Sequence, residues 1–78
     1  MERSEIFNKV KDIVVDALEV DPDSVTEETK FSDLNADSLD MLEVVMGIQD
    51  EFGLEIDSDA AQKITTVGAA VDAIQAQE

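Results

Sequence analysis

Hydrophobic residues recur at helical spacing in the first segment of the chain, from Ser4 to about Glu19. They are separated by three or four residues, which is the period of one helical face and predicts an amphipathic helix. The positions on this face are Ile6, Val10, Ile13, Val14, Ala17 and Leu18. Serine is a preferred N-terminal cap, so Ser4 is predicted to cap this helix. The helix should end before Pro22, because the residue preceding a proline is pushed out of helical geometry.

A second helix is predicted from about Ser38 to Glu51, with Gly53 as a suitable C-terminal stop. At about 100° per residue, its apolar residues separate into two opposite faces. The face predicted to join the core carries Met41, Val44, Val45, Ile48 and Phe52. The other face carries Leu39, Leu42 and Met46, beside Glu43 and Asp50. A helix needs only one apolar stripe to join a core, so the second predicts a recognition surface, with an overfilled core or a dimer seam as the alternatives.

The remaining segments complete an all-α pattern. Residues 20–36 show no hydrophobic period and are predicted to form a long loop. Val25, Phe31 and Leu34 are its natural anchors to the core. Asn35 can adopt the left-handed geometry of a sharp bend. A short helix can begin at Asp57 or Ser58 and run to about Lys63, with Ala60, Ala61 and Ile64 facing inward. A last helix, capped by Thr65 or Thr66, runs from Val67 to about Gln75. The sequence therefore predicts one domain over residues 1–78, a four-helix bundle with three longer helices and one short one. Gly68, inside the last helix, has no explanation in the sequence.

Charge is the dominant feature of the composition. Twenty acidic against five basic residues give a formal net charge of −15. Nucleic acid and anionic membrane surfaces would be repelled, which excludes both as partners. Partners with basic surfaces are favoured, and their encounter would be accelerated by electrostatic steering. The alternative interpretation is that the acidity only keeps a small protein soluble and monomeric.

Several kinds of site are excluded by what the sequence lacks. The absence of cysteine and histidine removes thiolate ligands, a cysteine nucleophile and the usual base for activating a serine. Asp21-x-Asp23 and Asp57-x-Asp59 resemble the start of a calcium loop but lack its central glycine and terminal glutamate, so no specific metal site is expected. Apolar runs are too short to insert into a membrane, and a cytoplasmic location is expected.

Ser38 is the candidate functional residue. One interpretation is that it caps the second helix, as most serines before apolar runs do. The other is that it is a site of modification, because it follows a forced bend and opens a helix with a spare apolar face. A phosphate ester at this position would meet free backbone N–H groups and the positive end of the helix dipole. The residues alone leave these two interpretations about even.

The segment Phe31-Ser32-Asp33-Leu34-Asn35-Ala36-Asp37-Ser38-Leu39-Asp40 resembles the prosthetic-group attachment motif of acyl carrier proteins. Further segments match the family in order and spacing: Glu43-Val44-Val45-Met46, Asp50-Glu51-Phe52, Ile56 and Lys63-Ile64-Thr65-Thr66-Val67. The resemblance covers essentially the whole chain. It is closest to the free-standing carriers of bacterial-type (type II) fatty acid synthesis.

This resemblance implies a non-enzymatic carrier whose Ser38 is esterified with 4′-phosphopantetheine from coenzyme A by a phosphopantetheinyl transferase. Asp37 would assist the transferase, and the arm's thiol would carry growing fatty acyl chains as thioesters to the enzymes of fatty acid synthesis. The family's docking surface, which meets basic patches on those enzymes, maps onto Asp37, Leu39, Asp40, Leu42, Glu43, Met46, Asp50 and Glu51. The sheltered acyl chain would contact Val44, Val45, Ile48, Phe52, Ile64 and Ala70.

Three positions depart from the family pattern: Asn35 replaces a usual glycine, Met41 a more often polar residue, and Asp57 a common proline. These differences leave open a specialised carrier for polyketide or other acyl chemistry. A rival from a different class is an unmodified acidic module that binds basic proteins, for which Ser38 would be dispensable.

Overall fold

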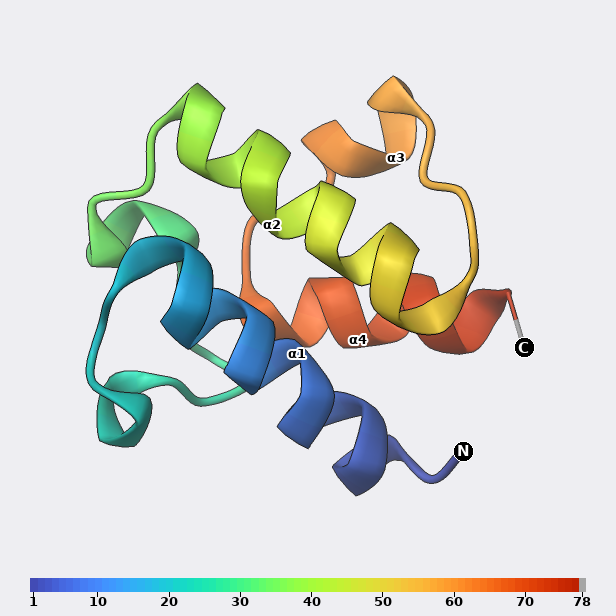
Figure 1. Ribbon diagram of the computed structural model, residues 1–78, viewed down its shortest axis with the longest axis horizontal. Helices are drawn as coiled ribbons and strands as arrows, with labels where there is room; N and C mark the ends of the chain where they lie inside the picture. Colours follow the sequence, from blue (N-terminus) through green and yellow to red (C-terminus); the bar gives the residue numbers. More distant parts are fainter. Residues whose placement is uncertain (78) are drawn as a thin grey trace.

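The computed structural model describes residues 1–77, and in this part of the chain all regular structure is helical (Figure 1). The α-helices are α1 (Arg3–Leu18), α2 (Ser38–Phe52), α3 (Ser58–Gln62) and α4 (Val67–Ala76). Two 3-10 turns, η1 (Pro22–Ser24) and η2 (Phe31–Leu34), interrupt the loop between α1 and α2. None of the described helices is long and apolar enough to cross a membrane. The predicted three longer helices, one short helix and long loop are confirmed.

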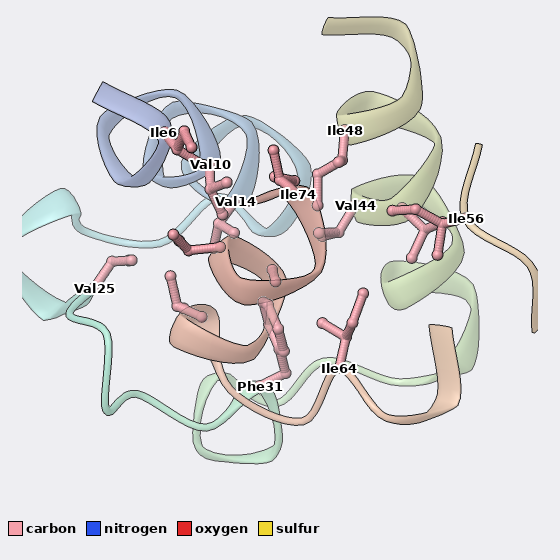
Figure 2. Packing of buried hydrophobic residues seen from close by; sticks show 14 residues of the cluster. Ile6, Val10, Val14, Val25, Phe31, Val44, Ile48, Ile56, Ile64 and Ile74 are labelled. Atoms are coloured by element: carbon pink, nitrogen blue, oxygen red, sulfur yellow. The ribbon is translucent and has the colours of Figure 1, made fainter. Parts of the chain in front are cut away.

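Helix α1 packs against both α2 and α4, and the core lies between these three helices. Ile6, Val10 and Val14 of α1 are wholly buried. Figure 2 shows them beside Ile74 of α4, with Val44 and Ile48 of α2 across the cluster. The other buried hydrophobic residues are Val25, Phe31, Val45, Ile56, Ile64, Val67, Ala70 and Val71. The predicted core faces of α1 and α2 are therefore confirmed. The residues of these faces that lie at the edge of the core are Ile13, Ala17, Leu18, Met41 and Phe52.

The long loop is fixed to the start of α4 by backbone hydrogen bonds. Val67 N donates to Thr29 O at 3.0 Å, and Gly68 N donates to Glu27 O at 2.9 Å. These loop carbonyls satisfy amides at the α4 N-terminus that have no partner within the helix. A Cβ atom on Gly68 would lie 2.8 Å from Glu27 O, so the helix and loop can meet this closely only with glycine. Non-local packing thus explains the glycine that helical periodicity left unexplained.

Arg3 ties the start of α1 to both the loop and α4. Its guanidinium donates to Glu27 Oε1 from Nε at 3.0 Å, to Asp72 Oδ1 at 2.7 Å and to Gln75 Oε1 at 2.8 Å. Hydrogen bonds to the Glu27 and Asp72 carboxylates raise the pKa of Arg3 above its ordinary value. The predicted cap by Ser4 is wrong: the cap position is two residues earlier, at Glu2, which makes no side-chain cap hydrogen bond. The ties made by Arg3 draw this residue into the first turn.

Candidate functional site

Asp37, rather than Ser38, caps helix α2. Asp40 N donates to Asp37 Oδ1 at 2.9 Å, and Asp37 N donates to Asp40 Oδ2 at 3.2 Å, which makes a reciprocal capping box. Of the two interpretations of Ser38, the capping one is therefore wrong, because Asp37 has the extended backbone of a cap and Ser38 already lies inside the helix. Ser38 takes the first helical position and its side chain is exposed. The Ser38 hydroxyl therefore does not cap the helix, and capping no longer competes with modification as the interpretation of this residue.

The bend that precedes Ser38 is the one predicted at Asn35. Asn35 has φ 61° and ψ 29°, and its N–H donates to Ser32 O at 3.2 Å. Left-handed geometry of this kind is tolerated by asparagine better than by most residues. The bend closes η2 and directs the chain through Ala36 into the cap of α2. It thereby holds Ser38 at the surface, at the positive end of a helix of 15 residues.

Two backbone amides beside the Ser38 hydroxyl remain available. Within residues 1–77, the N–H groups of Ser38 and Leu39 have no hydrogen-bond acceptor, whereas those of Asp40 and Met41 bond to Asp37. Such groups are suited to phosphate oxygens, since they combine free donors with the helix dipole. The first turn of α2 is thus compatible with a phosphodiester on Ser38. The negative charge of the adjacent Asp37 carboxylate partly offsets the attraction of this turn for phosphate.

A pocket of about 750 Å³ opens beside Ser38, between α2 and α3. Its walls are mainly apolar, and its size falls in the range of about 300–1,000 Å³ that is usual for ligand sites. The lining residues are Ala36, Asp37, Ser38, Met41, Leu42, Val45, Met46, Gln49, Ile56, Ser58, Ala61, Gln62 and Ile64. The serine hydroxyl and an apolar recess therefore adjoin each other.

Only part of the predicted acyl-chain lining reaches this pocket. Val45 and Ile64 line it. Val44, Ile48 and Ala70 are wholly buried in the core, and Phe52 is half-buried outside the lining. The pocket lies on the α3 side of α2, rather than in the centre of the bundle. Helical periodicity identified the buried face of α2 but could not indicate where α3 leaves space against it.

The second apolar stripe of α2 is exposed, as its position opposite the core face predicts. Leu39, Leu42 and Met46 are 72%, 55% and 53% exposed. The stripe continues into the pocket, because Leu42 and Met46 also line it. Glu43 and Asp50 are exposed and adjoin the stripe at helical spacing.

The other two acidic residues of α2 lie apart from this stripe. Asp40 is half-buried and engaged with Asp37 in the capping box. The Glu51 carboxylate lies 3.7 Å from Lys9 Nζ, on the side of α2 that faces α1. The structure thus brings Glu43 and Asp50 together with the apolar stripe and places Asp40 and Glu51 elsewhere.

Comparisons with known proteins by family, by sequence and by structure agree. The family described as "Phosphopantetheine attachment site" matches residues 8–74. The acyl carrier protein of Lactobacillus acidophilus is 52% identical over 79 aligned residues, covering 100% of this chain and 99% of the relative. That of Picosynechococcus sp. is 58% identical over 71 residues, covering 90% and 88%. The solved structure of the Enterococcus faecalis acyl carrier protein superposes with a TM-score of 0.82 at 43% identity and covers all of both chains.

Proposed function

The chain belongs to the acyl carrier protein family, and we propose that it carries growing fatty acyl chains as thioesters on a 4′-phosphopantetheine group esterified to Ser38. The proteins of this family are carriers rather than enzymes, and they depend on this covalent prosthetic group. When bound, the group supplies a flexible arm that ends in a thiol. The reactive sulfur that the chain itself lacks is therefore provided by the cofactor.

The observation that carries this assignment is the position of Ser38 inside the matched family region. It is exposed at the first position of α2, beside two unpaired amides and at the mouth of an apolar pocket. Asp37 caps the helix through Oδ1, and we assign to its other carboxylate oxygen the role of assisting the phosphopantetheinyl transferase. The same residue thus holds Ser38 in place and presents a charge next to it.

The pocket between α2 and α3 is the proposed shelter for the acyl chain. Val45 and Ile64 supply its inner wall, together with Met41, Ile56 and Ala61. Val44, Ile48, Phe52 and Ala70 form the layer behind that wall, and longer chains would displace them by repacking. Burial of apolar chain carbons contributes about 0.8 kcal/mol per methylene, which favours the sheltered state over exposure to water.

The exposed face of α2 is the proposed docking surface for the transferase and for fatty acid synthesis enzymes with basic patches. Leu39, Leu42 and Met46 provide apolar contact, and Glu43 and Asp50 provide charge. Asp40 and Glu51 contribute to the acidic field of the helix from its sides. A net charge of −15 favours basic partners and opposes self-association, so we propose that the protein is a monomer. We also propose that it acts in the cytoplasm.

Intact mass measurement tests the assignment. The apo protein is incubated with coenzyme A and a broad-specificity phosphopantetheinyl transferase, and it should gain the mass of one phosphopantetheine. Ser38→Ala should gain none. Ser58→Ala, which removes another serine of the same pocket, should be modified as the wild type is. Absence of the added mass in the wild type, or its persistence in Ser38→Ala, would contradict the proposal and favour an unmodified acidic interaction module.

A further inference from the structure

Gln49 is the last residue of α2 that lines the pocket, and Ser38 is the first. Both residues line the pocket and both belong to α2, eleven positions apart. At 1.5 Å per residue, they are separated by about 16 Å along the helix axis. A chain that enters beside Ser38 and runs along α2 therefore approaches Gln49 at its far end.

Gln49 also lines a second hollow next to the main pocket. This hollow has a volume of about 370 Å³ and is lined by Gln49, Glu55, Ile56 and Asp57. Gln49 and Ile56 are the two residues that line both spaces. Removal of the Gln49 side chain would therefore extend the main pocket toward the second hollow.

Gln49 fixes the loop between α2 and α3 as well. Gly53 N and Leu54 N donate to Gln49 O at 2.9 and 3.3 Å, as in an ordinary helix end. In addition, Ile56 N donates to Gln49 Oε1 at 2.8 Å in a partly buried contact. A side-chain amide thus accepts a backbone N–H that the end of the helix does not reach.

This hydrogen bond is important because α3 has few other attachments. None of the five residues of α3 is fully buried. Ala60 and Ala61 are partly buried against the core, and Ile56 and Ile64 are buried on either side of the helix. The other side-chain tie to this loop is Gln77 Nε2, which donates to Glu55 O at 2.6 Å. Loss of the Gln49 bond should therefore loosen the wall of the pocket that α3 provides.

We propose that Gln49 determines the chain-length specificity of this carrier, as the end wall of the acyl pocket and as the residue that holds the α2–α3 loop against it. The inference rests on the proposed function, because it assumes that the acyl chain occupies this pocket. Gln49 acts on the space available to the chain and takes no part in attaching it.

The test combines hydrogen exchange with thermal unfolding of acylated protein. Wild type, Gln49→Ala and Gln49→Glu are compared with Asn8→Ala, a control that also removes a side-chain amide. Asn8 is exposed on α1, lines neither space and makes no side-chain hydrogen bond within residues 1–77. Each protein is loaded with hexanoyl, octanoyl, decanoyl or dodecanoyl phosphopantetheine by the transferase, and its Tm is compared with that of its unacylated holo form.

In Gln49→Ala, the Ile56 amide should exchange roughly three- to tenfold faster than in the wild type, as expected for one lost hydrogen bond. Gln49→Glu, which keeps an acceptor, and Asn8→Ala should retain the wild-type exchange rate. The Tm gain from acylation should level off at a longer chain in Gln49→Ala than in the wild type and in Asn8→Ala. If the proteins load normally but Gln49→Ala leaves the Ile56 exchange rate or the chain-length profile unchanged, the proposed role of Gln49 is overturned. The proposed function is not affected by that outcome. Failure to load the wild type would overturn the proposed function, and the inference with it.

Discussion

Gly68→Ala should destabilise the protein even though alanine is the better helix former. Helical propensity alone favours the substitution by about 1 kcal/mol. The new Cβ atom, however, would lie 2.8 Å from Glu27 O and 3.4 Å from Glu27 Cβ. The obstructing atom is a backbone carbonyl, and it also accepts the hydrogen bond from Gly68 N. The loop must therefore move away from α4 and weaken the bond that holds it there.

The cost of that movement exceeds the gain in propensity. Overpacking costs about 1–3 kcal/mol, and a net hydrogen bond contributes about 0.5–1.5 kcal/mol. We expect the free energy of unfolding to fall by about 1–3 kcal/mol in Gly68→Ala. For a domain of this size, each kcal/mol corresponds to about 4–8 °C in Tm. A loss of at least about 4 °C is therefore expected.

Thermal and urea unfolding followed by circular dichroism would measure this loss. Ala69→Gly is the matched control, because it changes the neighbouring residue of α4 in the opposite direction. It should lose about 1 kcal/mol, the propensity difference. A Gly68→Ala variant with a Tm equal to or above the wild type would refute the close contact between α4 and the loop.

Three further predictions concern the cap, the docking face and the net charge. Asp37→Ala should lose about 1 kcal/mol of stability in urea unfolding, because it removes the cap of α2. Apo Ser38→Ala should stay within about 0.5 kcal/mol of the wild type, and the reverse order of the two losses would make Ser38 the cap. Glu43→Lys should lower the turnover of the acylated protein by a fatty acid synthesis enzyme without changing helical content, while Glu28→Lys, the same change in the α1–α2 loop, should not. Equal turnover of the Glu43→Lys variant and the wild type would mean that the acidic face is only solubilising. Magnesium chloride should raise the Tm, since cations screen the repulsion from a net charge of −15; an unmoved Tm would contradict this.

The sequence was most informative where structure depends on local spacing. The two faces of α2 follow from helical periodicity, which separated buried Val44 and Ile48 from exposed Leu39. The stop at Gly53 and the bend at Asn35 follow from the few residue types that tolerate left-handed geometry, and both have positive φ. These features are set by neighbours along the chain, so they could be predicted without the fold.

The features that were missed depend on contacts between distant segments. The reason for Gly68 lies in Glu27, forty-one residues away, and the start of α1 reflects the bonds of Arg3 to α4 and the loop. The extent of the acyl pocket depends on how α3 lies against α2, which periodicity does not specify. The residues alone left the capping role of Ser38 open, because serine is a good cap, and the extended backbone of Asp37 decides it.

The most direct test of the carrier function is peptide mapping by mass spectrometry of the protein purified from its native cells under conditions that preserve thioesters. We expect phosphopantetheine on the peptide that contains Ser38, with part of the population bearing acyl chains that hydroxylamine releases. The remaining serines, Ser4, Ser24, Ser32 and Ser58, should be unmodified. An unmodified Ser38, or phosphopantetheine on one of the other serines, would contradict the carrier function.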